Sequence, residues 1–252
     1  VTNESNKFLS NREGLLSKCL TYFIAIMTLL SLSCSRKTAD VARTNHELKV
    51  LTYNIHHANP PSKKEVIDID AIVDVIKREN PDVVALQEMD KNVNRSGKID
   101  QTKIIAEKAG MNYHFFKAID YDGGEYGVAI LSKFKIRNPK QIILPKAKEK
   151  SETRTLGYVE ILHPNGQKII FACTHLCVES EASRVMQVQA ILNELGKTDQ
   201  PTILCGDLNS SQGSESITLL QEHFTNSCKD NCGFTVAVIN PKRNIDFILT
   251  KN

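Results

Sequence analysis

The sequence predicts a two-sheet α/β domain, and three observations support this fold class. Short apolar runs of strand length alternate with segments whose apolar residues recur at helical spacing. Early in this pattern a strand, a helix and a strand follow one another within about 40 residues, which predicts a right-handed crossover between parallel strands. Further on, the turn sequence His163-Pro-Asn-Gly166 separates two apolar runs and predicts an antiparallel hairpin. The 252 residues, 41% of them hydrophobic, suffice for one large domain with its own core.

The first half of the domain is expected to contain two helices and four strands. Residues 67–80 carry apolar side chains at helical spacing, and Pro81 ends this helix. Residues 101–109 form a second helix, which Gly110 closes. The apolar runs expected to form strands are 48–55, 82–88, 113–117 and 126–132.

The second half continues the alternation. Residues 181–195 are amphipathic, and the face expected to point inward carries Val185, Val188, Ile191, Leu192 and Leu195. A short helix is expected near 214–222. The remaining apolar runs are 154–162, 167–174, 202–209, 234–238 and 244–249.

The N-terminal segment has the pattern of a secretory signal. Lys7, Arg12 and Lys18 precede an apolar run over 19–32, which is short for a membrane span. Cys34 follows this run and Ser33, so the segment resembles a bacterial lipobox in which Cys34 would carry the lipid. Plain secretion and an uncleaved anchor remain as alternatives.

This pattern divides the chain into three parts. We expect a signal peptide over 1–34, a polar tether over 35–46 and the folded domain over 47–252. The expected location is the bacterial cell envelope, with the membrane as a partner through lipidated Cys34. The net charge of +3 is too small to indicate nucleic-acid binding by itself.

Four of the five cysteines beyond the signal segment fall into two groups. Cys173 and Cys205 lie in apolar runs and are expected to be small core residues. Cys228 and Cys232 either close a small disulfide loop in an oxidising compartment or remain free thiols.

Polar side chains follow several of the predicted strands. Asp207 and Asn209 occupy alternate positions of extended chain after an apolar run, so both point to the same side. Asn54, Glu88 and His175 end other predicted strands. Each of them alone is an ordinary turn, loop or core residue, but together they indicate a site at the carboxyl ends of a sheet.

The residue types suit chemistry on phosphate esters. Mg²⁺ held by Glu88, with Asn54 or Asp207 near it, would neutralise charge on a phosphodiester, and Mn²⁺ is a second candidate. Arg154 and His175 can donate hydrogen bonds to phosphate oxygens. Asp207 or a histidine would activate the attacking water.

Seven sequence blocks resemble the endonuclease/exonuclease/phosphatase superfamily, the deoxyribonuclease-I-like group. The blocks follow the order of that family and extend over nearly the whole predicted domain. They are Thr-Tyr-Asn-Ile (52–55), Leu-Gln-Glu (86–88), Tyr-Gly-Val-Ala-Ile-Leu-Ser (126–132), Thr-Arg (153–154), Thr-His-Leu (174–176), Gly-Asp-Leu-Asn-Ser (206–210) and Ile-Asp-Phe-Ile-Leu (245–249).

The resemblance implies a four-layer α/β/β/α sandwich and divalent-metal phosphoesterase activity. It implies metal binding by the residues at Asn54 and Glu88, and contact with or activation at the phosphate by His175, Asp207 and Asn209. The family also places a residue matching Asp246 beside a catalytic histidine.

That histidine belongs to a Ser-Asp-His segment which, in the family, follows the last of the seven blocks. The sequence contains no Asp-His pair. We therefore expect a C-terminally truncated domain without its final strand. His56, His57 and His223 are the weak substitutes for the histidine. The alternative to an active enzyme is a catalytically impaired lipoprotein of the same fold that binds metal and phosphate, or one in which these polar residues are incidental.

The family acts on nucleic acids, lipid headgroups and inositol phosphates, and an envelope location favours nucleic acid or a lipid headgroup as the phosphodiester. No obligate protein partner is expected.

Overall fold

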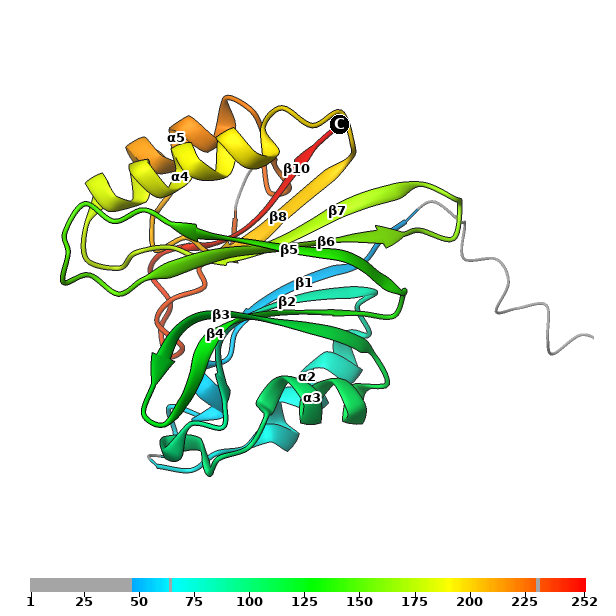
Figure 1. The fold of residues 1–252 in the computed structure, drawn as a ribbon, viewed down its shortest axis with the longest axis vertical. Coiled ribbons are helices and arrows are strands. Elements are labelled where there is room, and N and C mark those ends of the chain that lie inside the picture. The colour runs from blue at the N-terminus through cyan, green and yellow to red at the C-terminus, as the bar shows by residue number, and fades with distance from the viewer. Residues whose placement is uncertain (1–46, 64, 230–231) are drawn as a thin grey trace, which may run out of the picture. The chain divides into compact units, whose positions relative to one another are not determined.

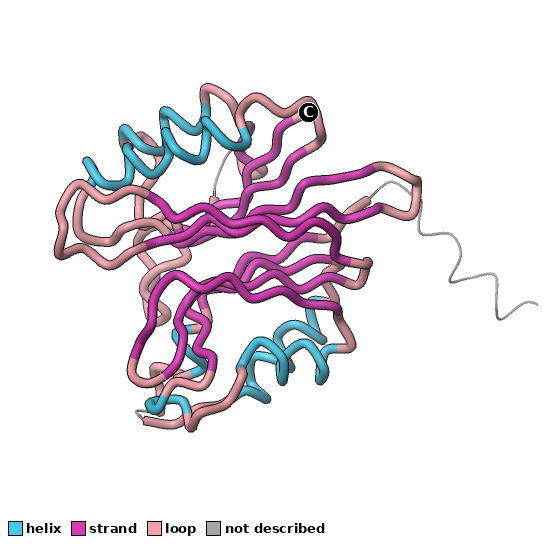
Figure 2. The backbone as a smooth tube through the Cα atoms, in the orientation of Figure 1, coloured by secondary structure: helices cyan, strands magenta, loops and turns pink. Residues whose placement is uncertain are grey.

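A computed structural model of the chain describes residues 47–63, 65–229 and 232–252. The compact unit over Leu48–Asn252 consists of two β-sheets packed face to face, with helices on both outer faces (Figure 1). The predicted four-layer α/β/β/α sandwich is therefore confirmed. Figure 2 shows the same layers, with the helices outside the paired sheets.

The first sheet has four strands in the order β1-β2-β4-β3. Its strands are β1 (Val50–Asn54), β2 (Val83–Lys91), β3 (Asn112–Tyr121) and β4 (Gly124–Ser132). β1 and β2 pair in parallel, and α2 (Ile69–Glu79) lies between them in sequence, as the crossover prediction requires. The other pairs in this sheet are antiparallel.

The second sheet has six strands in the order β5-β6-β7-β8-β10-β9. Its strands are β5 (Ile136–Leu144), β6 (Arg154–Leu162), β7 (Lys168–His175), β8 (Thr202–Asp207), β9 (Thr225–Asn226) and β10 (Asp246–Lys251). The predicted hairpin joins β6 and β7, and its turn is closed by the His163 N–H, which donates to the Gln167 carbonyl at 2.8 Å.

Local capping sequences set the starts of the helices. The side chain of Asp68 accepts from the third backbone N–H of α2, and Asp100 does the same for α3 (Gln101–Ala109), which ends at the left-handed Gly110. Ser180 caps α4 (Glu181–Leu195), and Ser214 caps α5 (Glu215–Gln221). Two short 3₁₀ turns, η1 (His56–Ala58) and η2 (Asn94–Ser96), complete the helical elements of the described residues.

Three apolar cores hold the layers together. The middle core lies between the sheets and includes Phe116, Phe171 and the buried Cys173 and Cys205, as expected for these cysteines. A second core lies between the first sheet and helices α2 and α3, and a third lies between the second sheet and helices α4 and α5. Each sheet is thus buried on both faces, which explains the nearly continuous apolar runs of its central strands.

Two parts of the sequence behave differently from the prediction. β5 was not expected because Asn138-Pro139 interrupts it, but proline is tolerated on an edge strand, and β5 lies at the sheet edge. Residues 234–238 form no strand and contribute only an isolated bridge between Val236 and Arg243. β10 is bordered by β9 at Leu249 and Thr250, so its outer side is partly paired.

The proposed signal (1–34) and tether (35–46) lie outside the described residues. No helix in the part of the chain described here is long and apolar enough to cross a membrane. Of the alternatives left open for Cys228 and Cys232, the structure contains the disulfide.

Candidate metal and phosphate site

The polar residues expected at the site come from both sheets. Asn54 ends β1 and Glu88 lies in β2. His175 ends β7, Asp207 ends β8 and Asp246 begins β10, and in the strand register Asp207 pairs with His175 on one side and with Asp246 on the other. β1 and β2 both contact β8 across the sandwich, so the groups from the two sheets face each other.

Asn54 joins the two sheets at this point. Its Nδ2 donates to Glu88 Oε1 at 2.9 Å and to Asp207 Oδ2 at 3.0 Å. Its Oδ1 accepts from the backbone N–H of His56 at 3.0 Å. Side chains that are 34 and 153 positions from Asn54 in sequence therefore meet at one amide group.

An irregularity in β2 directs the Glu88 side chain. The pairing of β2 with β4 shifts register between Leu86 and Met89, as in a β-bulge, and Glu88 has a positive φ of 60°. Such a backbone conformation costs about 1–3 kcal/mol in a residue other than glycine and persists only where the surroundings enforce it. Bulges frequently re-aim a side chain beside a functional site. Here the bulge accompanies the contact of Glu88 with Asn54.

Negative charge is concentrated around Asp207. Burial raises the pKa of Asp207 to about 6, and the neighbouring Asp246 carboxylate contributes in the same direction. Hydrogen bonds from Asn54 and from the backbone N–H of Asn209 oppose this rise. Burial also raises the pKa of Asp246.

No described lysine or arginine forms an ion pair with Asp207 or Asp246. Nor does any histidine of the described residues hydrogen-bond to Asp246. His56, His57 and His223 therefore do not take the role that the family gives to the histidine beside this aspartate.

Arg154 and His175 form a second, buried pair beside the carboxylates. Arg154 donates from NH1 to His175 Nδ1 at 3.0 Å, and the same nitrogen lies 2.9 Å from Glu152 Oε1. Because a guanidinium only donates, Nδ1 of His175 must accept, and the neutral ring carries its proton on Nε2. That nitrogen lies 3.9 Å from Asp207 Oδ2, which is too far for a direct hydrogen bond.

The protonation state of His175 follows from the same contacts. Burial lowers the pKa of His175 well below 6.5, and the charge of Arg154 acts in the same direction. The ring is therefore neutral at neutral pH and acts as an Nε2–H donor. Arg154 also has an Nε that is buried without a hydrogen-bond partner among the described residues. Both groups have donor capacity left for an anionic ligand.

Asn209 stabilises the site through two hydrogen bonds. Its backbone N–H donates to Asp207 Oδ1 at 2.9 Å, and its side-chain Nδ2 donates to the Leu176 carbonyl at 3.0 Å. It adopts a left-handed φ of 49°, which asparagine tolerates better than most residues. In this structure Asn209 fixes the Asp207 carboxylate and the turn that follows β8.

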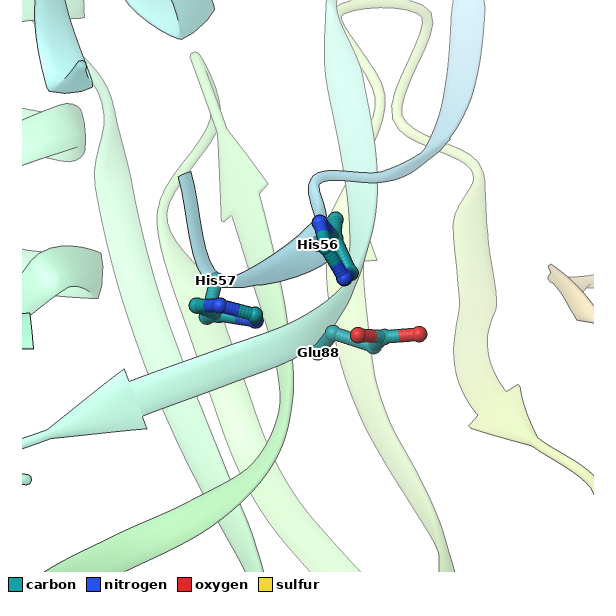
Figure 3. A group of neighbouring side chains, drawn as sticks. All are labelled: His56, His57 and Glu88. Atoms are coloured by element: carbon teal, nitrogen blue, oxygen red, sulfur yellow. The ribbon is translucent and has the colours of Figure 1, made fainter. Parts of the chain in front are cut away.

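Two histidines lie beside Glu88 whose place at the site the sequence does not predict. His56 and His57 follow Asn54 directly in η1, and their rings lie next to the Glu88 side chain (Figure 3). Their position just after a strand that ends in a candidate ligand was the signal available in the sequence.

The donor set fits a divalent cation of the Mg²⁺ type. Carboxylates of Glu88, Asp207 and Asp246 gather here without a lysine or arginine partner among the described residues. All the side-chain groups on offer are hard oxygens, which Mg²⁺ and Mn²⁺ prefer. A bound cation would relieve the repulsion that raises the pKa of Asp207. Glu88, Asp207 and, after rotation of its amide, Asn54 are the residues able to hold it.

A cleft opens beside these groups. Its volume is about 950 Å³, and its wall includes Asn54, Glu88, Asp207 and Asp246. The segment over 234–241 contributes apolar side chains to the same lining. The carboxylates are thus accessible to a ligand of small-molecule size.

Comparisons with known proteins identify solved structures of similar fold. The chain is similar to an endonuclease/exonuclease/phosphatase from Beutenbergia cavernae, with 21% identity and a TM-score of 0.66, over 81% of this chain and 64% of that one. It is similar to a mannosyl-6-phosphatase from Bacteroides thetaiotaomicron, with 20% identity and a TM-score of 0.65, over 81% of this chain and 85% of the other. The human Nocturnin catalytic domain with bound sulfate has 20% identity and a TM-score of 0.62, over 81% of each chain.

These structures share the fold of the described domain. No protein in the curated set matches the sequence. The family model described as Endonuclease/Exonuclease/phosphatase family matches residues 51–252, which include every residue of the site and all of both sheets except Val50. On this match, which covers most of its length, the chain belongs to the Endonuclease/Exonuclease/phosphatase family, whose members are hydrolytic phosphoesterases.

Proposed function

We propose that this chain is a divalent-metal-dependent hydrolase of phosphodiester bonds, with Mg²⁺ as its ion and Mn²⁺ as a substitute. One observation carries the proposal. Asn54 bridges the carboxylates of Glu88 and Asp207, and the hydrogen-bond donors Arg154 and His175 lie beside them. This arrangement places anion-binding donors next to a cation site, since His175 Nε2 lies 3.9 Å from Asp207 Oδ2.

The residues have separate roles in this proposal. Glu88 and Asn54, with Asp207 beside them, would hold the ion, which when bound supplies positive charge to the phosphate and the leaving oxygen. Arg154 and the Nε2–H of His175 donate to the non-bridging phosphate oxygens. Asp207, with its pKa raised to about 6, is the carboxylate best suited to accept a proton from water near neutral pH.

The charge of the site favours a diester over a monoester. Arg154 is the only cationic side chain among the described residues grouped here, and it already pairs with Glu152. A diester carries one negative charge at neutral pH, and a monoester carries nearly two, so the diester needs less compensation. We infer nucleic acid or a lipid headgroup as the substrate class.

Hydrolysis by this chain tests the proposal directly. With Mg²⁺, bis(4-nitrophenyl) phosphate should be cleaved faster than 4-nitrophenyl phosphate, and EDTA should stop the reaction until Mg²⁺ is restored. Release of 4-nitrophenolate measures both rates. Turnover that is insensitive to EDTA would remove the metal from the mechanism, and turnover of the monoester alone would refute the preference for diesters.

A second function is favoured by one observation, the absence of a histidine partner for Asp246 among the described residues. In that case the chain binds metal and phosphate without turnover. The same assay separates the two, because a binding protein would be stabilised by Mg²⁺ in a thermal melt but would release no nitrophenolate. At a Mg²⁺ concentration of 100 times Kd, binding to the native state adds about 2.7 kcal/mol to the stability.

We further propose that the protein resides in the bacterial cell envelope and is anchored by a lipid on Cys34. The support is the basic segment, the apolar run over 19–32 and the cysteine that follows it. Cys34→Ser is expected to move the protein from the membrane fraction to the soluble fraction of a bacterial host, as measured by immunoblot. An unchanged membrane fraction would contradict lipid anchoring through this residue.

A further inference from the structure

Three side chains next to the oxygen-rich site offer a different set of ligands. His56 and His57 in η1 and Glu88 in β2 each present one ligand atom, and these atoms lie within 4.8 Å of one another. Figure 3 shows the His56 ring over the Glu88 carboxylate and the His57 ring beside it. No hydrogen bond or ion pair joins either ring to Glu88, so this space is not filled by a direct contact among the three described residues.

The hydrogen bonds of His56 leave one ring nitrogen free. His56 Nδ1 lies 3.0 Å from the backbone carbonyl of Asn59. Because a carbonyl only accepts, Nδ1 carries the proton and Nε2 keeps its lone pair. A histidine that binds a metal usually donates its other ring N–H to a carbonyl or carboxylate in this way, which fixes the tautomer and the ring orientation. His56 therefore already has the tautomer of a ligand.

His57 contains a ring nitrogen that no contact explains. Its Nδ1 is buried and has no hydrogen-bond partner among the residues that the structure describes. A buried polar atom without a partner costs about 1–3 kcal/mol, so such atoms need an explanation. An ion coordinated through Nδ1 would give this atom a partner and secure the orientation of the ring.

The backbone holds both histidines in place. His56, His57 and Ala58 have successive positive φ values of 48°, 43° and 60°. The turn is held by the Ala58 N–H, which donates to the Ile55 carbonyl at 2.9 Å, and by the buried Gln101, whose Nε2 donates to the His57 carbonyl at 2.7 Å. Three left-handed residues in a row are unfavourable for L-amino acids and need such support. The support fixes the backbone positions from which both rings extend.

The ligand types determine the class of ion. Two imidazole nitrogens and one carboxylate oxygen suit Zn²⁺ and related first-row transition metals better than Mg²⁺, which prefers oxygen alone. Three protein ligands with an open fourth position are also the pattern of catalytic zinc sites. Zinc lies about 2.0–2.2 Å from such ligand atoms, so two of them are at most about 4 Å apart, and small side-chain rotations would close the present spacing.

We propose that His56, His57 and Glu88 form a second cation site, which takes a divalent transition metal of the Zn²⁺ type and shares Glu88 with the oxygen-donor site. One carboxylate has two oxygens, so Glu88 can face both positions while its Oε1 remains near Asn54. Paired ions about 3.5–4 Å apart are a common arrangement in phosphoester-hydrolysing enzymes. Binding at the histidine site requires no turnover and is tested without substrate.

Co²⁺ is the probe for the experiment because its visible absorption reports coordination by protein ligands. The full chain, made metal-free, is titrated with Co²⁺ and then with Zn²⁺. We expect one equivalent of Co²⁺ to give a visible band and Zn²⁺ to abolish it. His56→Asn and His57→Asn should each weaken Zn²⁺ binding at least about tenfold. Asparagine is chosen because it tolerates the left-handed backbone but lacks an imidazole.

Two control variants make the result specific. His223→Asn replaces an exposed histidine beyond α5 and should leave the Co²⁺ band and the Zn²⁺ affinity unchanged. Asp207→Asn removes a ligand of the oxygen-donor site alone and should leave the Co²⁺ band while it reduces stabilisation by Mg²⁺. Thermal melts of each variant confirm folding. Absence of a Co²⁺ band in the folded chain, or a band that survives both His56→Asn and His57→Asn, would overturn the site.

Discussion

Replacing Glu88 with glutamine is expected to lower Mg²⁺-dependent phosphodiester hydrolysis by at least about 100-fold in kcat/KM. Glutamine has the size of glutamate and can still accept the hydrogen bond from Asn54 Nδ2. It removes only the negative charge with which the site would hold a cation. Steady-state rates with bis(4-nitrophenyl) phosphate give the loss of activity, and thermal melts with and without Mg²⁺ give the loss of ion binding.

The matched control is Glu107→Gln, which makes the same chemical change at an exposed position of α3. Among the described residues, the Glu107 carboxylate pairs with Lys103, one turn away, at 3.9 Å. Such surface pairs contribute little, so activity and stability should remain within experimental error. If Glu88→Gln retained full metal-dependent activity while folding normally, Glu88 would have no part in holding the ion.

The site was predictable to the extent that it depends on strand ends. Asn54, His175 and Asp207 each terminate a strand, and this can be read from an apolar run followed by a polar residue. The bulge that brings Glu88 to Asn54 cannot be read in this way. It depends on the register between β2 and β4, which packing of the two strands determines.

The same distinction applies to the fold. α3 and α4 begin and end at the predicted residues because Asp100, Gly110 and Ser180 are strong local caps. β5 was missed because its local sequence, with Pro139 and exposed side chains, opposes a strand. Only pairing with β6 makes it one, and pairing is a tertiary interaction.

The arrangement of the turn η1, which carries His56 and His57, could not be predicted from the local sequence. His56 and His57 carry no motif of their own, and their left-handed backbone is enforced partly by Gln101, more than 40 positions away in sequence. Their closeness to Glu88 results from the parallel pairing of β1 with β2. The sequence shows two adjacent histidines, and only the fold places the Glu88 carboxylate beside them to form a set of ligands.

Asp207→Asn is expected to stabilise the metal-free protein at pH 8 by about 1–2 kcal/mol, although it should abolish activity. The pKa of Asp207 is raised to about 6 from 3.8, so the folded protein binds this proton more tightly than the unfolded chain does. The associated stability is present below pH 3.8 and is lost as the pH rises through about 6. The full linkage would be on the order of 3 kcal/mol, and the loss of one good hydrogen bond to Asn54 reduces the net gain.

Urea denaturation of the metal-free proteins at pH 5 and pH 8 measures this effect. The wild type should lose stability relative to Asp207→Asn between these two values, and the difference should shrink when Mg²⁺ is added, because the ion stabilises the ionised carboxylate only in the wild type. Asp199→Asn, at an exposed aspartate before β8, keeps Asp207 and should follow the pH dependence of the wild type. Equal pH dependence in the wild type and Asp207→Asn would mean that this carboxylate is already compensated in the folded state. A site that holds acidic groups together for a cation is expected to destabilise the metal-free protein. The sign of this pH dependence measures that destabilisation without any substrate.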